Sequence, residues 1–277
     1  YYKVYTYDKA FPDLSTHKSI YDLSRVCEAV FVCVPTPMRE DGSCDISIVK
    51  SVVQDACSTG RRNIIVIKST IPPNTTKALQ DLCQDSQIVF NPEFLLERNA
   101  EEDFENTTRV ILGGPRPATT RLKQFYSKIF PNADIIKTDS TIAEMVKYLT
   151  NILPRYPGTY FRLTFSIEGF DQEHDDIRSM PGSFDKIRDS YSIISPMRKQ
   201  YGNLVLDSNS VFTVNNEDTL LKTLQLLDDN FDFVIINLAC WINDRCFKPS
   251  KFISKLKFKK CKISKKPGCS SRNKKSN

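Results

Sequence analysis

The chain has 277 residues, a formal net charge of +6, 40% hydrophobic and 26% charged residues, as expected for a globular protein of one or two domains. No apolar run reaches the roughly 18–20 residues that span a bilayer, which argues against a membrane protein. Tyr1–Asp8 is strand-like and lacks the basic start and small-residue cleavage site of a signal peptide, so a cytoplasmic location is expected.

The positive charge lies at the C-terminal end of the chain. Residues 247–277 contain 12 Lys/Arg and no Asp or Glu, which leaves residues 1–246 with a net charge of −6. We expect this basic tail to be disordered. Contact with nucleic acid or anionic lipid would depend on the tail alone, and nothing else in the sequence favours such a partner.

Nine cysteines are spread along the chain without any C-x-x-C pair, so the sequence predicts no metal site. Disulfides are not expected in a cytoplasmic protein. Cys33 follows Val30–Val32 in an apolar run, which predicts a small core residue.

Residues 1–150 alternate short apolar runs with amphipathic stretches such as Ile46–Cys57 and Thr75–Cys83. The predicted strands are Lys3–Tyr7, Ala29–Val34, Asn63–Lys68, Gln87–Asn91, Arg109–Leu112 and Ala133–Ile136. This alternation predicts a Rossmann-like, doubly wound parallel sheet in the α/β class.

After Pro154 and Pro157 a second strand–helix series begins. Its predicted elements are a strand at Tyr160–Ser166, a helical stretch at Phe184–Tyr201, a strand at Asn203–Val214, a helix at Glu217–Leu227 and a strand at Phe231–Leu238. We therefore divide the chain into a nucleotide-binding-type domain at 1–150, a partial (β/α) barrel-like fragment at 151–246 and the tail.

Polar and rigid residues follow several predicted strands. Asp8 ends the first one, where a dinucleotide fold places a carboxylate at a ribose, although an Asp there is also a common turn residue. Pro35-Thr36-Pro37 forms a stiff exit that could line a cofactor or be an ordinary loop. Ser69 and Thr70 could bond a ligand or cap the next helix.

Two pairs of charged or polar residues are spaced four apart. Glu93 and Glu97 in Asn91-Pro92-Glu93-Phe94-Leu95-Leu96-Glu97 would share a helical face, as a general base with a ligand contact or as acids at a helix N-terminus. Lys147 and Asn151 could stabilise an oxyanion or form a solvated helix face.

Taken in order, VPTP…DG…D, KSTIPP.T, NPEFL.E.nA..D…R and AEM.KY..N resemble the UDP-glucose/GDP-mannose dehydrogenase family over about residues 1–151. The resemblance implies NAD-dependent oxidation of a nucleotide sugar, with UDP-glucose, UDP-N-acetyl sugars and GDP-mannose left open as substrates, and the oligomeric state undetermined.

The resemblance also implies residue roles. Asp8 would bind the adenosine ribose, and Glu93 would act in proton transfer beside the sugar. Glu97 would contact cofactor or substrate, and Lys147 and Asn151 would act with Glu93 in catalysis by holding the nucleotide sugar or the developing intermediate. The expected lining of the NAD site is Cys33, Val34, Pro35, Thr36, Pro37, Ser69 and Thr70.

Departures from the family pattern lead us to expect a truncated and inactive chain. No G-x-G-x-x-G precedes Asp8, so the first strand and the pyrophosphate loop of the family have no counterpart. Nothing after Asn151 matches the segment with the family's nucleophilic cysteine. Asn74 and Arg98 stand where the family usually has glycine.

Residues 152–239 resemble a radical S-adenosylmethionine enzyme fragment through Ser166-Ile167-Glu168-Gly169 and His174-Asp175-Asp176-Ile177-Arg178. The C-x-x-x-C-x-x-C loop is absent, so neither an iron–sulfur cluster nor S-adenosylmethionine is expected. The acids and His174 would then be turn and cap residues. A radical enzyme fragment and a non-catalytic composite chain remain the alternatives to a dehydrogenase.

Overall fold

The computed structural model describes residues 2–95, 97–212 and 219–238. The chain forms two compact units, which meet in the sequence between Arg155 and Tyr156. Both units are α/β, as the element pattern predicts. The predicted basic tail at 247–277 lies outside the described residues.

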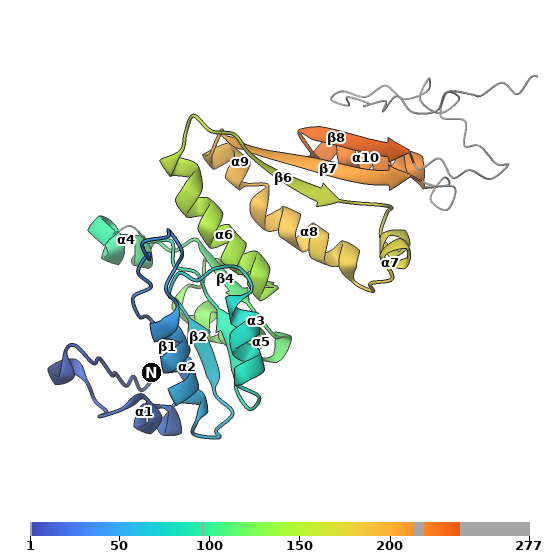
Figure 1. Cartoon of the computed structure of the whole chain (residues 1–277). Coiled ribbons are helices and arrows are strands. Elements are labelled where there is room, and N and C mark those ends of the chain that lie inside the picture. The colour runs from blue at the N-terminus through green and yellow to red at the C-terminus, as the bar shows by residue number, and fades with distance from the viewer. Residues whose placement is uncertain (1, 96, 213–218, 239–277) are drawn as a thin grey trace, which may run out of the picture. The chain divides into compact units, whose positions relative to one another are not determined.

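The first unit holds a five-stranded sheet in the order β1-β2-β3-β4-β5, with helices between the strands (Figure 1). The strands are β1 (Ala29–Val32), β2 (Ile64–Ile67), β3 (Gln87–Phe90), β4 (Arg109–Gly113) and β5 (Asp134–Thr138). The helices are α1 (Ile20–Val26), α2 (Ser47–Cys57), α3 (Thr75–Leu82), α4 (Ala100–Glu105), α5 (Arg116–Ile129) and α6 (Ser140–Ile152).

The sheet is parallel except at one pairing. β1, β2 and β3 run parallel, β4 joins β3 antiparallel through Phe90 and Gly113, and β5 runs parallel to β4. The predicted parallel, doubly wound sheet is confirmed in three of the four strand pairings, and the structure differs from it where β4 runs antiparallel to β3. A right-handed crossover that starts from a reversed strand carries its helix to the opposite face, so α5 lies across the sheet from α2 and α3.

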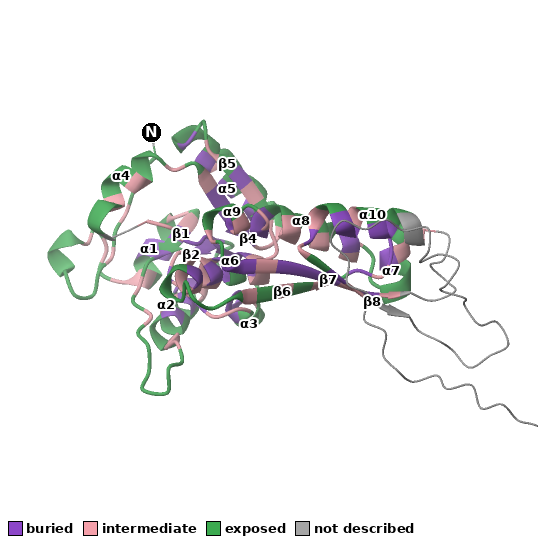
Figure 2. Cartoon of the chain, turned by 90° about the horizontal axis from the view of Figure 1, so that it is seen from above, coloured by how far each residue is buried: buried purple, intermediate pink, exposed green. Residues whose placement is uncertain are grey.

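Both faces of this sheet are buried at the inner strands β2 and β3. Ala118, Leu122 and Tyr126 of α5 pack on Val66 and Val89, which point to one face of the strands. Ile65, Ile67, Ile88 and Phe90 point to the other face and are fully buried. Figure 2 shows the buried residues following the strands and the inner sides of the helices. Continuous apolar strands such as Ile64–Ile67 are what a sheet covered on both sides requires.

Helix α6 approaches β4 closely at a glycine. A Cβ on Gly113 would lie 2.6 Å from the Ala143 Cβ and 2.8 Å from the Ser140 Cα. The absence of a side chain at Gly113 therefore permits the packing of α6, the helix that carries Lys147.

The predicted strand at Lys3–Tyr7 does not form. Thr6 instead bonds to the loop that follows it, through its N–H to the Thr16 hydroxyl (2.8 Å) and its carbonyl to the Thr16 N–H (2.9 Å). A strand pattern yields a strand only where a neighbouring strand supplies the ladder of hydrogen bonds, and no described strand pairs with this segment.

A disulfide joins Cys57 at the end of α2 to Cys83 just after α3. The expectation that the chain has no disulfide is therefore wrong in this structure. The fold brings the two Cα atoms to 5.8 Å, within the range that a disulfide bridges. Spacing along the sequence could not show this, because 26 positions separate the two residues.

The second unit contains the parallel sheet β6-β7-β8, whose three strands lie where strands were predicted. The structure adds helix α7, which was not predicted, and divides the predicted helical stretch Phe184–Tyr201 into α8 and α9. The strands are β6 (Phe161–Ser166), β7 (Leu204–Phe212) and β8 (Phe233–Leu238). The helices are α7 (Gln172–Arg178), α8 (Ser183–Ile194), α9 (Met197–Gln200) and α10 (Leu220–Asn230). Exposed and half-buried residues alternate along β6, so one face of this sheet is more accessible to solvent than the other.

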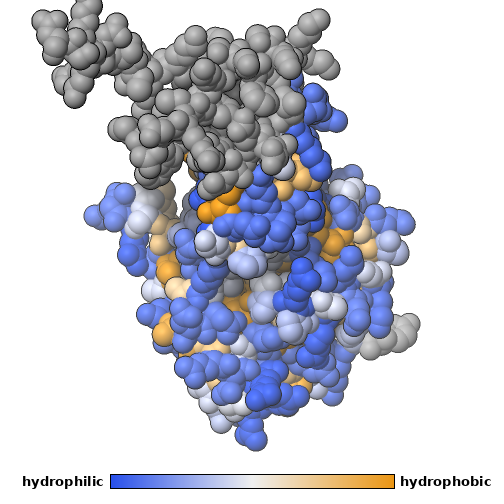
Figure 3. Space-filling model, turned by 90° about the vertical axis from the view of Figure 1, so that its right-hand side faces the viewer, coloured by the Kyte–Doolittle hydropathy of each residue, from blue (hydrophilic) through white to orange (hydrophobic). Residues whose placement is uncertain are grey.

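Hydrophilic residues dominate the face drawn in Figure 3, and hydrophobic residues form small separate patches on it. Scattered exposed apolar residues of this kind are normal on a protein surface. Among the described residues, no helix combines the length and the apolar character needed to cross a bilayer.

Candidate functional site

The carboxyl ends of β1, β2 and β3 bring together several of the residues predicted from the sequence. Cys33 and Val34 follow β1, Lys68 and Ser69 follow β2, and the segment from Asn91 follows β3. Neighbouring parallel strands end at the same edge of a sheet, which is where α/β proteins bind their ligands.

The Ser69 hydroxyl connects the first two of these strand ends. It accepts a hydrogen bond from the Val34 N–H (2.9 Å) and lies 2.7 Å from the Val34 carbonyl, to which it can donate. Ser69 thus fixes the path of the chain into Pro35, Thr36 and Pro37, which lack regular secondary structure. Thr70 is half-buried beside it.

The prediction that Cys33 is a core residue is wrong. β1 ends at Val32, and the side chains alternate along it, with Val30 and Val32 buried and Phe31 exposed. Continuing this alternation turns Cys33 to the solvent side, where the residue is exposed.

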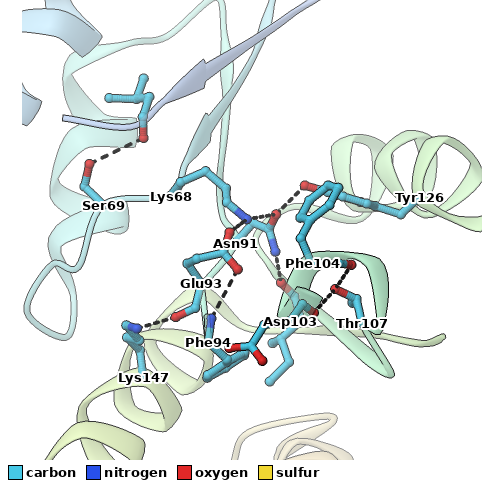
Figure 4. Close-up of polar contacts among 12 residues, drawn as sticks. Lys68, Ser69, Asn91, Glu93, Phe94, Asp103, Phe104, Thr107, Tyr126 and Lys147 are labelled. Carbon is cyan, nitrogen blue, oxygen red and sulfur yellow. Dashed lines mark hydrogen bonds and ion pairs between the residues drawn. The ribbon is translucent and has the colours of Figure 1, made fainter. Parts of the chain in front are cut away.

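Glu93 is contacted by two lysines of the site, Lys68 and Lys147. Its Oε2 lies 2.7 Å from the Lys68 Nζ, and its Oε1 accepts a hydrogen bond from the Phe94 N–H (3.2 Å). The Glu93 side chain is 36% exposed and that of Lys68 18% exposed. A charged pair that is only partly buried can still contact a solute. Figure 4 shows Glu93 between Lys68 and Lys147.

Lys147, on α6, is the second lysine at Glu93. Its ammonium donates to the Glu93 backbone carbonyl and lies 5.7 Å from the centre of the Phe94 ring. Burial lowers the pKa of Lys147, the charge of Lys68 adds to this, and the charge of Glu93 opposes it. A lysine with a lowered pKa exchanges protons nearer to neutral pH than a solvated one.

Asn91 and Tyr126 extend the contacts of the Lys68–Glu93 ion pair into the core. The Asn91 side chain oxygen accepts hydrogen bonds from the Tyr126 hydroxyl (2.5 Å) and the Lys68 ammonium (3.2 Å). Neither Lys68 nor Tyr126 was singled out from the sequence. The signal for Lys68 was a charged residue directly after the buried strand Ile64–Ile67, whereas Tyr126 gave no signal.

The expected helical pairing of Glu93 with Glu97 is wrong. Glu93 lies in a segment without helix, and Glu97 begins the short 3-10 helix Glu97–Asn99. Pro92 precedes Glu93, and the ion pair with Lys68 holds the side chain at the strand end. The side chain of Glu97 is outside the described part of the chain.

Two further predicted residues have different surroundings. Asn151 lies on α6, one turn after Lys147, and is half-buried. The Asp8 carboxylate accepts hydrogen bonds from the N–H groups of Ala10 (2.8 Å) and Phe11 (3.1 Å). Asp8 therefore acts as a turn residue in this structure.

Glu144 is a buried residue of the site region that the sequence analysis missed. Its carboxylate accepts hydrogen bonds from the Asn74 N–H (2.6 Å), the Thr76 N–H (2.8 Å) and the Thr76 hydroxyl (2.6 Å). Asn74 has a φ of +73°, a conformation that Asn tolerates better than most residues. Glu144 thus attaches α6 to the start of α3.

In the second unit, His174 is buried and contacts the Glu168 N–H (3.1 Å) and the Ser183 hydroxyl (3.2 Å). The Asp175 carboxylate accepts from the N–H groups of Gly182 and Phe184 at the start of α8. This agrees with the interpretation of these residues as turn and cap residues. Among the described residues, no group of three or more His, Cys, Asp or Glu could hold a metal ion.

Residues 7–132 match the family model described as "UDP-glucose/GDP-mannose dehydrogenase family, NAD binding domain". UDP-glucose 6-dehydrogenase of Rickettsia bellii is 34% identical over 131 residues, which are 45% of this chain and 30% of that protein. UDP-N-acetyl-D-mannosamine dehydrogenase of Methanococcus maripaludis is 38% identical over 130 residues, with the same two shares.

A solved GDP-mannose dehydrogenase from Pseudomonas aeruginosa aligns with a TM-score of 0.47 and 14% identity, covering 92% of this chain and 83% of that one. The matched part of the chain spans about a third of the length of its curated relatives. The resemblance of residues 152–239 to a radical enzyme has no support among these matches. Residues 7–132 are an NAD-binding domain of the UDP-glucose/GDP-mannose dehydrogenase family.

Proposed function

We propose that the first unit serves the NAD-dependent oxidation of a nucleotide sugar, with Glu93 at the reacting hydroxyl. The observation that carries the proposal is the convergence of Lys68 and Lys147 on Glu93, at the ligand-binding edge of the sheet in an NAD-binding domain. The names of the relatives support a nucleotide sugar as the substrate class.

Oxidation of an alcohol removes a proton from oxygen and a hydride from carbon. NAD, when bound, accepts the hydride. Glu93 supplies a carboxylate that can accept the hydroxyl proton directly or through a water, and the ion pair with Lys68 at 2.7 Å positions that carboxylate. The Lys147 ammonium places positive charge beside the oxygen from which the proton leaves.

The expected lining of the NAD site is retained in this proposal. Cys33 to Pro37, Ser69 and Thr70 would lie along the cofactor, Glu97 and Asn151 would contact cofactor or nucleotide sugar, and Asp8 would bind the ribose. Its present turn would then have to open, because its carboxylate bonds to the Ala10 and Phe11 N–H groups. Since the sequence contains no G-x-G-x-x-G, we expect this chain to need a high concentration of NAD.

The test follows NADH absorbance when the protein is mixed with excess NAD and, separately, UDP-glucose, a UDP-N-acetyl sugar and GDP-mannose. The sequence departures predict an inactive chain, whereas the convergence of Lys68 and Lys147 on Glu93 predicts slow NADH formation with at least one of them. Glu93→Gln should abolish it, because an amide cannot accept the proton. Glu28→Gln is the matched control, since Glu28 is exposed and paired with Arg121 away from these strand ends.

Equal rates for Glu93→Gln and the unchanged protein would overturn the role of Glu93. A complete lack of NADH with all three nucleotide sugars, at NAD concentrations where calorimetry shows binding, would overturn the proposed oxidation by this chain.

A further inference from the structure

The side chain amide of Asn91, at the end of β3, is fixed at both ends. Its nitrogen donates to the Ile111 carbonyl of β4 (2.9 Å), and its oxygen accepts from Tyr126 and Lys68. Asn91 is 2% exposed. The amide can satisfy these three contacts in one orientation only, because turning it over would set its nitrogen against two donors.

These contacts form a continuous chain of hydrogen bonds that ends at the candidate site. It begins at the Tyr126 hydroxyl on α5, passes through the Asn91 oxygen to the Lys68 ammonium, and reaches the Glu93 carboxylate (Figure 4). The partners come from three segments: Tyr126 from α5, Lys68 from the end of β2, and Asn91 and Glu93 from the segment after β3.

Tyr126 is well suited to begin such a chain. Its ring is buried in the core cluster with Leu122, Phe130 and Leu112, which fixes the position of the hydroxyl. Burial raises the pKa of Tyr126, and the negative charge of Glu93 adds to this. The hydroxyl therefore stays protonated and remains a donor throughout the physiological pH range.

We propose that Tyr126 is a positioning residue, whose hydroxyl orients Asn91 so that Lys68 holds the Glu93 carboxylate in one direction. The core on the α5 side of the sheet thereby sets the geometry of a site at the sheet edge. The inference rests on the proposed role of Glu93 for its catalytic consequence, but the hydrogen-bond chain itself can be tested without any activity.

The first experiment records NMR signals of the Lys68 ammonium nitrogen and the Glu93 carboxyl carbon in the full chain. Tyr126→Phe removes one hydroxyl and keeps the ring. Tyr191→Phe is the matched control, because it also removes a hydroxyl with a hydrogen bond of 2.5 Å, made to Asn230 in the second unit. We expect both signals to shift in Tyr126→Phe and neither in Tyr191→Phe. Unchanged Lys68 and Glu93 signals in Tyr126→Phe would overturn the proposal.

A double-mutant cycle separates positioning from general loosening of the core. The Asn91→Ala substitution already interrupts the series of hydrogen bonds between Tyr126 and Lys68. In that background, Tyr126→Phe should therefore no longer shift the Glu93 signal. Lys68→Gln, which breaks the next contact, provides the same test if Asn91→Ala does not fold. A Tyr126→Phe shift of undiminished size in these backgrounds would overturn the proposal.

The catalytic consequence is measured as the rate of NADH formation at saturating NAD. Tyr126→Phe should lower kcat about two- to tenfold, the value of one hydrogen bond, while the KM for NAD stays the same. If the unchanged protein forms no NADH, the proposed function fails, and the NMR signals alone decide on Tyr126. An unchanged kcat with shifted signals would overturn the catalytic part of the proposal.

Discussion

The Glu144 carboxylate accepts a hydrogen bond from the backbone N–H of Thr76 at 2.8 Å, although 68 positions separate the two residues. Glu144 is fully buried in α6, one turn before Lys147. Thr76 lies in the first turn of α3, where backbone N–H groups have no partner within the helix. A side chain of α6 therefore completes the start of α3.

Glu144→Gln should destabilise the first unit. Burial raises the pKa of Glu144 and the three donated hydrogen bonds oppose that rise, so the site is built for oxygen acceptors. An amide would turn its NH2 group toward the Asn74 or Thr76 N–H, and leaving a buried donor unsatisfied costs about 1–3 kcal/mol. Urea unfolding would measure the loss, and Glu102→Gln on exposed α4 is the control. A loss no larger than the control's would contradict the expectation.

Gly113→Ala should also destabilise the first unit, because the new methyl group would collide with Ala143 and Ser140 of α6. Overpacking of this kind costs about 1–3 kcal/mol. Gly158→Ala is the matched control, since a Cβ there meets no atom within 4 Å. Equal melting temperatures for the two variants would show that α6 does not need the glycine.

Removing the Cys57–Cys83 disulfide should lower stability. The bond joins residues 26 positions apart, for which chain entropy predicts a stabilisation of about 3.5 kcal/mol. The measurement compares unfolding of the unchanged protein with and without reductant against a Cys57→Ser/Cys83→Ser double variant. Reductant should destabilise the former and leave the latter unaffected. If reductant leaves the unchanged protein as stable as before, the bond contributes nothing to stability.

The stability of the second unit should decrease in acid because of His174. Burial has the largest effect on the pKa of His174 and lowers it. The negative charges of Glu168 and Asp175 raise this pKa, and the positive charge of Arg178 lowers it further. A folded-state pKa below 6.5 means that the unfolded chain binds more protons, so stability is full above the unfolded value and falls as pH drops through it toward the folded value.

Hydrogen exchange of the β6 and β7 amides at about pH 7.5 and about pH 5.5 brackets this window. His174→Gln should flatten the pH dependence, and His17→Gln in the first unit should not. A pH dependence that survives in His174→Gln would assign it to other groups.

The sequence predicted much of the fold because its signals are local. The apolar runs at Ile64–Ile67 and Gln87–Phe90 are long enough to be strands and are bounded by turn residues, so their existence did not depend on what surrounds them. The order of the family patterns over residues 1–151 likewise indicated the NAD-binding domain, which the family match confirms at residues 7–132.

Tertiary structure decided what depends on neighbours distant in the sequence. Lys3–Tyr7 has a strand pattern but no described strand pairs with it, and Cys33 is exposed because the alternation along β1 turns its side chain to solvent. The Cys57–Cys83 bond, the Glu144 contacts with α3 and the contacts from Tyr126 to Glu93 each join residues between 23 and 70 positions apart. Composition and periodicity carry no information about such contacts, since they arise only when packing brings the segments together.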